Sequence, residues 1–287
     1  MRDLNHQLKN LCQRNRDGSH ATQRDRERML SLIADQLHAL GFRGMNCRSL
    51  KPKHVDALLG HWRSQDLSVG TLKNRMAALR WWAQKVDRQN VIARSNEHYD
   101  IPERSFIGNA SKGKTVDASD LDKVRDPHVR VSLELQRAFG LRREEAIKFS
   151  PSYGDQGDHL RLKATWTTGG KARTVPVRTP AQREVLDRAH RLAGGGSLIP
   201  SHRNYRQQLR VYERHTANAG LSRLHGLRHQ YAQDRYQELT GWKAPAAGGP
   251  PARALSAEQR ALDRQARLTI SRELGHERTQ IVAVYCG

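Results

Sequence analysis

Apolar residues recur at helical spacing through the first hundred residues of the chain. In one segment, Met29, Ile33, Leu37 and Leu40 fall on a single stripe. Residues three and four apart share one face of a helix, so this spacing indicates a helix with one buried side. The same pattern predicts helices over three segments: 21–42, 51–62 and 67–86.

The periodicity is lost near residue 98 and returns after residue 116. Residues 98–116, HYDIPERSFIGNASKGKTV, contain Pro, Gly, Ser and Lys in place of an apolar stripe. Such a stretch between two patterned regions is typical of a connection between domains. We therefore expect a helical domain over 1–108, a linker over 109–116 and a second domain over 117–287.

The second domain contains one pattern of a different period. In HLRLKATW (159–166), Leu160, Leu162 and Ala164 alternate with polar residues, and a glycine turn leads to ARTVPV (172–177). Two short alternating runs around a Gly-Gly turn predict an antiparallel hairpin. Helical patterns surround it, and the predicted fold is mainly α with a small antiparallel β-sheet. The remaining helical segments are 180–193, 201–219, 225–239, 256–274 and 277–285, with a Pro/Ala/Gly-rich loop at 241–255.

The charge of the chain predicts a polyanionic partner. Fifty Lys and Arg face 29 Asp and Glu, a formal net charge of +21. Residues 1–110 hold 19 basic and 11 acidic side chains, and the remainder holds 31 and 18. A field of this sign over both halves argues against an ordinary metabolic enzyme and favours nucleic acid over an anionic membrane surface.

Cysteine and histidine usage excludes several other classes of site. Three cysteines are too few and too scattered for a disulfide framework or a CxxC site, and the 14 histidines lack metal-binding spacing. No apolar run is suited to a signal peptide or a membrane span. We expect a protein of the reducing cytoplasm that uses no metal and no cofactor and has no membrane partner.

Basic residues lie opposite the apolar face of the predicted helix 67–86. They are Lys73, Arg80 and Lys85. The solvated side of an amphipathic helix explains them, and so do contacts with phosphate groups. Both interpretations remain open at this point.

Four separated fragments combine residue types that suit chemistry on a phosphate. They are FGLRREE with Arg142, LHGLRHQYA with His225 and Arg228, LGHE with His276, and the last tyrosine, Tyr285. Each alone has an ordinary structural explanation, such as a surface arginine, a helix start, a helix end or a packed ring. Their order and spacing together call for another explanation.

Together these fragments resemble the tyrosine recombinase family, the phage-integrase-type site-specific recombinases. Members share TGLRxxE, HxLRH and LGH motifs and a tyrosine about nine residues beyond the last. Here the first motif supplies Arg142 and Glu145, and Tyr285 stands nine residues after His276. The family's T-x-x-x-R-x-x-A-L-R helix matches Thr71, Arg75, Ala78, Leu79 and Arg80. The resemblance covers nearly the whole chain and implies a helical core-binding (SAM-like) domain followed by a mixed catalytic domain.

The resemblance implies a role for each matched residue. Tyr285 is the nucleophile, and Arg142 and Arg228 hold the phosphate oxygens in the fork geometry that guanidinium provides. His225 assists deprotonation of the phenol or holds the phosphate, and His276 donates a hydrogen bond to a phosphate oxygen. Glu145 orients Arg142 as a supporting residue. In the first domain, DNA contacts are expected from Lys73, Arg75, Arg80 and Lys85.

Two positions depart from the family pattern. The lysine that members place in the hairpin turn is Thr168 here, so we expect Lys171, or Lys163 as second choice, to donate the proton to the leaving oxygen. His276 follows His225 by 51 residues, about twice the family's spacing, which marks 241–255 as an insertion. This insertion is either a tolerated loop or a surface that contacts DNA or a neighbour.

The implied function is site-specific recombination. By resemblance, the protein cuts and rejoins double-stranded DNA at paired sites through a 3′-phosphotyrosyl intermediate. It is a monomer when free and a homotetramer on DNA, and it serves a mobile element on a bacterial nucleoid. The alternatives are a type IB topoisomerase-like relaxing enzyme and a catalytically impaired DNA-binding relative. Family members often carry a tail beyond the tyrosine, whereas only Cys286 and Gly287 follow here, so protomers couple through other surfaces or the chain is truncated.

Overall fold

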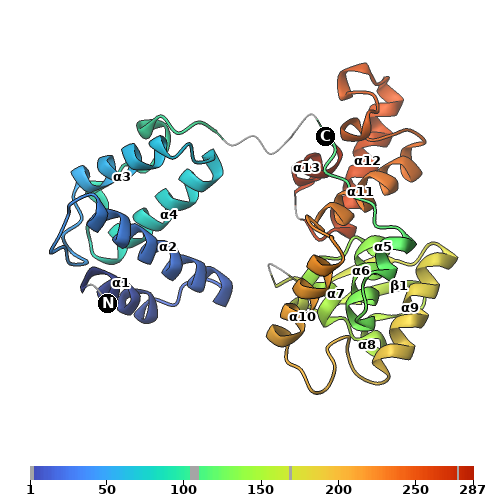
Figure 1. Ribbon diagram of the computed structural model, residues 1–287. Coiled ribbons are helices and arrows are strands. Elements are labelled where there is room, and N and C mark those ends of the chain that lie inside the picture. Colours follow the sequence, from blue (N-terminus) through green and yellow to red (C-terminus); the bar gives the residue numbers. More distant parts are fainter. Residues whose placement is uncertain (1–2, 104–109, 168–169, 277) are drawn as a thin grey trace. The chain divides into compact units, whose positions relative to one another are not determined.

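The computed structural model describes residues 3–103, 110–167, 170–276 and 278–287. The chain forms two compact units, Met1–Ser105 and Phe106–Gly287 (Figure 1). Each has its own buried apolar cluster: one in the first unit and two in the second.

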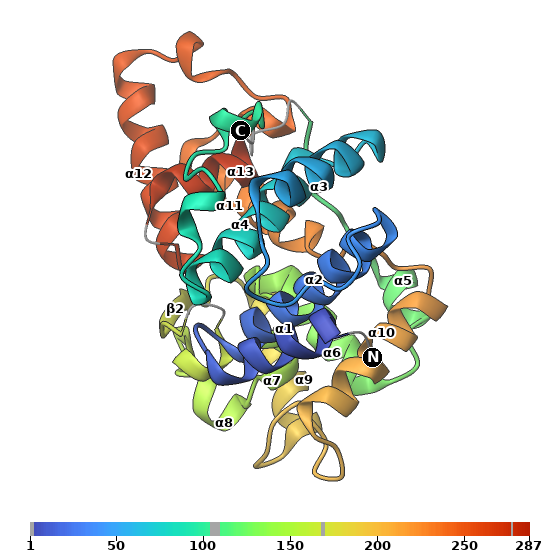
Figure 2. The ribbon, with the colours of Figure 1, turned by 90° about the vertical axis from the view of Figure 1, so that its left-hand side faces the viewer.

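The first unit is a bundle of four α-helices, seen from two directions in Figures 1 and 2. They are α1 (Asp3–Arg14), α2 (His20–Ala39), α3 (Pro52–Ser64) and α4 (Val69–Lys85), followed by the short 3₁₀ turns η1 (Gln89–Val91) and η2 (Glu97–Tyr99). Helix α2 packs against α1, α3 and α4. The hydroxyl groups of Ser19 and Ser68 accept from the main chain at the starts of α2 and α4.

The apolar stripe of α2 is rotated slightly from the predicted one. Ile33 and Leu37 are fully buried as expected. Leu30, beside the predicted stripe, is also fully buried, whereas Met29 is only partly buried against the same cluster. Leu40 is 37% exposed because the helix ends at Ala39, one residue before it. The core of the bundle is completed by side chains of α3 and α4, among them Leu58, Trp62, Leu79 and Trp82.

The second unit is helical around one small sheet. In order its elements are α5 (Ala118–Asp122), α6 (Pro127–Phe139), α7 (Arg143–Lys148), α8 (Pro151–Gly154), β1 (His159–Leu162), η3 (Ala164–Trp166), β2 (Arg173–Pro176), α9 (Pro180–Ala193), α10 (Tyr205–Asn218), α11 (Gly226–Thr240), η4 (Pro245–Ala247), η5 (Ala252–Ala254), α12 (Ala257–Glu273), η6 (Thr279–Val282) and α13 (Ala283–Cys286). Helix α6 packs against α7, α9, α10 and α11, and α11 packs against α12 and α13.

The predicted hairpin is confirmed, and its first strand is shorter than the sequence pattern. β1 and β2 pair antiparallel with Leu160 opposite Val175, and both side chains are fully buried. β1 ends at Leu162 because the Trp166 N–H donates to the Lys163 carbonyl and closes a 3₁₀ turn. Ala164, predicted to face the core from the strand, therefore lies in the turn.

The end of the chain also differs from the predicted helix over 277–285. The described residues form two short pieces, the 3₁₀ turn η6 and the single α-turn α13.

In the described part of the chain, no helix is long and apolar enough to cross a membrane. Nor do the described His, Cys, Asp and Glu residues gather in threes at metal-binding distance.

Candidate active site

Main-chain turns at the ends of helices place the matched residues around Tyr285. Arg142 immediately precedes α7, and His225 immediately precedes α11, on whose first turn Arg228 lies. His276 follows the end of α12 by three residues, and Tyr285 lies on α13. The structure thus brings together residues that are up to 143 positions apart in the sequence.

The hydroxyl of Tyr285 is held between a cation and an imidazole. Arg228 Nε donates to it over 3.3 Å, and His276 Nε2 lies 3.2 Å from it. The tyrosine is 5% exposed, and its carbonyl accepts a hydrogen bond of 2.9 Å from Gln233 Nε2. The aromatic ring of His229 lies 4.6 Å from the tyrosine ring. Both the ring and the main chain of Tyr285 are therefore fixed.

Arg228 is the most enclosed cation of the site, with 1% exposure. Its Nη1 donates to the Gly140 carbonyl over 2.6 Å, and its Nη2 donates to the Leu274 carbonyl. Burial, with the nearby charge of Arg142, lowers the pKa of Arg228 to about 10. The guanidinium is therefore still a cation at neutral pH, and its acceptors are two main-chain carbonyls and the Tyr285 hydroxyl.

The contacts of His276 fix its tautomer. Its Nε2 lies 3.4 Å from Arg228 Nη2, which can only donate, so Nε2 is the unprotonated nitrogen. Burial and the charges of Arg228 and Arg142 lower the pKa of His276 to about 4, so the ring is neutral at neutral pH. Because the Tyr285 hydroxyl already accepts from Arg228, its own proton points to His276 Nε2.

A buried carboxylate organises the arginine of the first motif. Glu145 is fully buried, accepts from the Arg142 N–H over 2.7 Å and pairs with Arg142 Nη1 at 3.0 Å. Arg173 binds the same carboxylate through both Nη atoms at 2.7 and 2.6 Å. Burial would raise the pKa of Glu145, but the hydrogen bonds and charge of Arg173 outweigh it and lower the pKa to about 2.

Arg173 is a site residue that was not among those predicted from the sequence. It lies on β2, its side chain is 6% exposed, and its Nε donates to the Glu273 carbonyl over 2.9 Å. Gly275 has a φ of +67°, and a Cβ there would lie 2.6 Å from Arg173 Cδ. The glycine of LGH is therefore needed for Arg173 to pass beneath the His276 turn. The position of Arg173 directly after the hairpin turn, in Lys171-Ala172-Arg173, was the available signal, but its buried acceptor, Glu145, was not apparent from the sequence.

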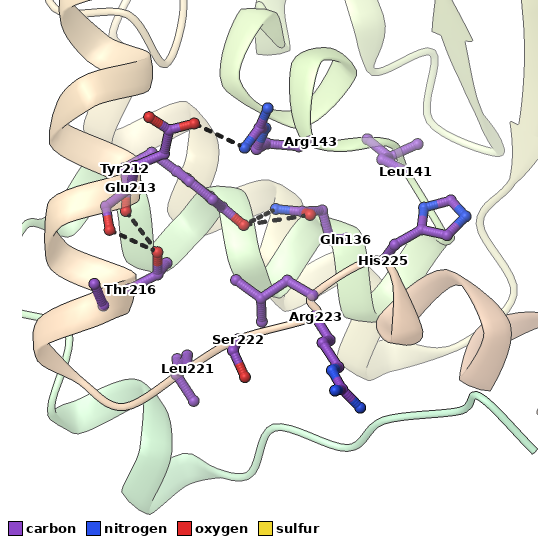
Figure 3. Close-up of a pocket in the computed structure, with 12 residues that line it drawn as sticks. Gln136, Leu141, Arg143, Tyr212, Glu213, Thr216, Leu221, Ser222, Arg223 and His225 are labelled. Carbon is purple, nitrogen blue, oxygen red and sulfur yellow. Dashed lines mark hydrogen bonds and ion pairs between the residues drawn. The ribbon is translucent and has the colours of Figure 1, made fainter. Parts of the chain in front are cut away.

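The ring of His225 lies farther from the Tyr285 ring than the ring of His276 does, with centroid distances of 6.1 and 5.6 Å. The His225 ring centroid is 5.4 Å from that of His229. Burial and the charges of Arg228 and Arg142 lower the pKa of His225. This ring also borders a pocket (Figure 3), in which Arg143 pairs with Glu213 at 3.1 Å.

The hairpin lysine stays a prediction. Thr168, the position that holds lysine in the family, lies outside the described residues. Lys171 is exposed before β2, and its carbonyl accepts from Thr167 Oγ1 over 2.6 Å. Lys163 Nζ lies 4.0 Å from the ring centroid of Tyr153 and 5.3 Å from that of Trp166, so aromatic faces already hold the second choice.

The basic residues of α4 differ in their surroundings. Arg80 donates through all three guanidinium nitrogens to the Ala93 and Ser95 carbonyls and the Asn96 side chain. The structure therefore gives Arg80 a packing role and not the solvated one proposed for that face. Lys73 lies partly exposed on the same helix.

Two further cations of α4 contact aromatic rings. Lys85 pairs with Asp17 at 2.9 Å and lies 5.8 Å from the ring centroid of Trp81. Arg75 is 8% exposed and stacks 5.2 Å from the Trp62 ring. Within the described residues, Arg75 Nε and Nη1 have no hydrogen-bond acceptor. The DNA contacts predicted for these residues stay predictions.

Two family models match the chain. The phage integrase N-terminal model matches residues 1–92, and the integrase model matches residues 108–234. The second match ends within α11, so the 241–255 segment and the last two motifs lie beyond it. A search of the curated proteins found no match.

Solved structures share the fold of the whole chain. A lambda integrase tetramer bound to a Holliday junction aligns with a TM-score of 0.60 and 15% identity, over 98% of this chain and 75% of that one. XerH recombinase in a post-cleavage complex with palindromic difH aligns with 0.61 and 17%, over 99% and 81%. The Tn1549 transposon integrase with circular-intermediate DNA aligns with 0.56 and 13%, over 100% and 96%. At these identities the likeness establishes the fold.

Proposed function

Because the chain belongs to the tyrosine recombinase (phage integrase) family, we propose that it cleaves and rejoins DNA through a 3′-phosphotyrosyl intermediate. The observation that supports this most directly is the position of the Tyr285 hydroxyl, within hydrogen-bond reach of both Arg228 and His276. A tyrosine that served only to pack its ring would not need two polar partners inside a buried, cationic site.

The oxygen of Tyr285 attacks the scissile phosphorus, and the bond to the 5′-oxygen breaks. The phosphate stays on the tyrosine as a diester, and the 5′-oxygen leaves with a proton as a free hydroxyl. Arg142 and Arg228 hold the non-bridging oxygens, on which charge grows in the transition state. Rejoining runs the same steps in reverse, and because the diester energy is kept, neither ATP nor a metal enters the balance.

His276, rather than His225, is the better-placed acceptor of the phenol proton. Its unprotonated Nε2 faces the hydroxyl at 3.2 Å, whereas His225 contacts Tyr285 through the ring. His225 is then available for the phosphate, the second of the two roles expected for it. A proton acceptor in hydrogen-bond reach contributes about 10²- to 10⁴-fold to such steps.

The DNA and the assembly belong to the same proposal. The net charge of +21 suits a double-stranded polyanion, and binding is expected to weaken steeply with salt. The lambda neighbour is a tetramer on a junction and the Tn1549 neighbour is a transposon integrase, which supports a tetramer on paired sites and a role in a mobile element. The free protein is then a monomer.

Covalent trapping on nicked DNA tests the proposal. A nick next to the cleavage site lets the short 5′-hydroxyl strand diffuse away, so the wild type is expected to accumulate a protein–DNA adduct. Tyr285→Phe keeps the ring and is expected to bind the same DNA without forming any adduct. An adduct of equal yield in Tyr285→Phe contradicts the assignment of the nucleophile, and no adduct from the wild type on a bound site contradicts the enzymatic proposal.

Lys171→Ala tests the proton donor separately. If Lys171 protonates the leaving oxygen, the variant cleaves slowly on ordinary DNA and recovers on DNA whose leaving oxygen is replaced by sulfur. Sulfur leaves without protonation, so this substrate removes the need for the acid. Lys163→Ala is the matched comparison, and equal cleavage by Lys171→Ala and the wild type would remove Lys171 from the site.

A further inference from the structure

The segment 241–255 is packed into the second unit at several points. Ala244 is fully buried, and Leu255 is 4% exposed. At its start, Thr240 Oγ1 donates to the Trp242 carbonyl over 3.0 Å, and at its end Arg260 Nε donates to the Leu255 carbonyl over 3.0 Å. These contacts are not those of a loop that is merely tolerated.

The turn at the centre of the segment is closed by the chain itself. The N–H groups of Ala247 and Gly249 both donate to the Ala244 carbonyl, over 2.8 and 3.0 Å. A Cβ at Gly249 would lie 1.7 Å from the Lys243 carbonyl oxygen, a distance that no side chain tolerates. Only glycine fits there, so any larger residue must open the turn.

The turn η4 packs directly against α13, the helix of the nucleophile. Ala244 belongs to the same buried cluster as Tyr285 and Cys286. A Cβ at Gly287 would lie 2.7 Å from the Ala246 nitrogen, which shows how closely the two main chains approach. In Figure 1, α13 lies beside α11 and α12 at one end of the second unit.

Helix α13 depends on such neighbours, because it has only four residues. Isolated helices shorter than about 12 residues are marginal in water, so the position of Tyr285 is set by tertiary contacts. Helix α11 supplies one side through Gln233 Nε2, which donates to the Tyr285 carbonyl, and η4 supplies another.

We propose that the 241–255 segment is a positioning element. It holds α13 so that the Tyr285 hydroxyl stays within hydrogen-bond distance of Arg228 and His276 of the same protomer. This proposal rests on the proposed cleavage reaction and adds a requirement to it. The nucleophile is assembled by its own chain before DNA binds, and the inserted segment does the assembling.

Gly249→Ala tests the proposal from the side of the segment. We expect adduct formation on nicked DNA to slow by at least about 10-fold, since a displacement of about 1 Å can cost 10²-fold, while the Kd for DNA stays within about twofold. Gly195→Ala is the matched control, because Gly195 is exposed and a Cβ there meets nothing within 4 Å. Wild-type rates in Gly249→Ala would overturn the proposal.

A double-mutant cycle separates positioning from a general loss of folding. Gly287→Ala presses on the same contact from the side of α13. If both variants break one contact, the double variant is no slower than the slower single one, whereas independent folding defects multiply. Multiplied losses, or a DNA Kd that rises in parallel with the loss of rate, would overturn the proposal.

A spectroscopic readout keeps the test independent of cleavage. Protein labelled with 3-fluorotyrosine gives a ¹⁹F signal for Tyr285, identified by its disappearance in Tyr285→Phe. The signal is expected to shift or broaden in Gly249→Ala and to stay in place in Gly195→Ala. If the wild type forms no adduct, the cleavage proposal fails and the ¹⁹F comparison still decides the positioning one; an unmoved signal in Gly249→Ala overturns it. Should Gly249→Ala not fold, Pro245→Gly, which loosens η4 without a clash, takes its place with the same expected directions.

Discussion

Arg228 in the second unit and Arg75 in the first are both almost completely buried, but their surroundings are opposite. Arg228 is 1% exposed and donates to two main-chain carbonyls and to the Tyr285 hydroxyl. Arg75 is 8% exposed, lies over the Trp62 ring, and has two nitrogens without an acceptor among the described residues. Burying an unpaired charge normally lowers the stability of the fold. Hydrogen-bond acceptors offset this cost at Arg228, whereas an aromatic ring offsets it at Arg75.

The difference shows what each arginine is prepared for. Carbonyl acceptors fix the guanidinium of Arg228 without cancelling its charge, so an incoming phosphate meets a cation whose geometry is already set. An aromatic face attracts the charge of Arg75 more weakly and leaves its nitrogens undirected. In the proposed reaction, Arg228 is therefore prearranged for the phosphate, whereas packing on Trp62 sets the position of Arg75.

Replacing Arg228 is expected to give the largest effect. Arg228→Lys keeps the charge but cannot reach the Gly140 carbonyl, the Leu274 carbonyl and the phosphate together. Loss of one prearranged donor costs about 10²- to 10³-fold in rate, and we expect at least that in adduct formation on nicked DNA. Arg137→Lys is the control and should cleave normally. Arg137 also donates to a main-chain carbonyl, that of Val116. A Lys variant within threefold of the wild type would show that the fixed fork is unimportant.

Glu145→Gln tests the pairing of Arg173, the second buried arginine of the site. The substitution removes the charge of its partner, so that Arg173 resembles Arg75 in having no counter-charge. The amide leaves Arg173 without its counter-charge, and breaking such a pair costs about 3 to 5 kcal/mol in the free energy of unfolding. Glu144→Gln is the control, because that pair with Lys148 is partly exposed and worth about 0.2 to 1 kcal/mol. Urea unfolding at pH 7 measures both.

The lowered pKa of Glu145, about 2, predicts how the difference in stability between the wild type and Glu145→Gln changes with pH. Because the folded pKa lies below the unfolded value of 4.5, the stabilisation is complete above pH 4.5 and is lost as pH falls towards 2. The wild type is therefore expected to approach Glu145→Gln in stability over that range. A constant difference between the two proteins from pH 5 to pH 2.5 would contradict the assigned pairing.

Protonation of His276 is expected to have a smaller effect on stability, in a different pH range. Its folded pKa of about 4 lies below the usual value of 6.5, so protonation favours the unfolded chain. Stability is expected to fall as pH drops from 6.5 to 4, and His276→Gln should remove part of this fall. His20→Gln, at an exposed position, should leave the profile unchanged. An unaltered profile in His276→Gln would show that burial and the charge of Arg228 do not lower the pKa of this ring.

The sequence predicted the helices and the hairpin because their patterns are local. The stripe of α2 and the alternation of β1 depend on burial of one face, and both were found with small errors at their ends. Those errors arose where a main-chain hydrogen bond ends an element before its apolar pattern ends, as the bond from Trp166 to Lys163 does after β1. Such bonds leave no periodic signal.

The motifs predicted which residues meet at Tyr285 but not how they are held. The contacts of Arg173 with Glu145 and Glu273 join a strand to helix ends far apart in the sequence, so no local pattern shows them. The proton transfer to His276 that we propose depends on one tautomer, which follows from Arg228 Nη2 lying 3.4 Å from His276 Nε2. The burial of Ala244 in the 241–255 segment was likewise invisible in a Pro/Ala/Gly-rich stretch.

Arg75→Met completes the comparison of the two arginines with the smallest expected effect. Methionine fills the space over Trp62 and removes a buried charge without a partner, so the loss of about 0.5 to 1 kcal/mol of cation–π attraction is offset by relief of desolvation. The free energy of unfolding should change by less than about 1 kcal/mol. If Arg75 reaches a DNA phosphate, the dependence of log Kd on log salt loses about one unit of slope. An unchanged slope, beside a reduced one in Lys73→Met, would leave Arg75 a purely structural cation.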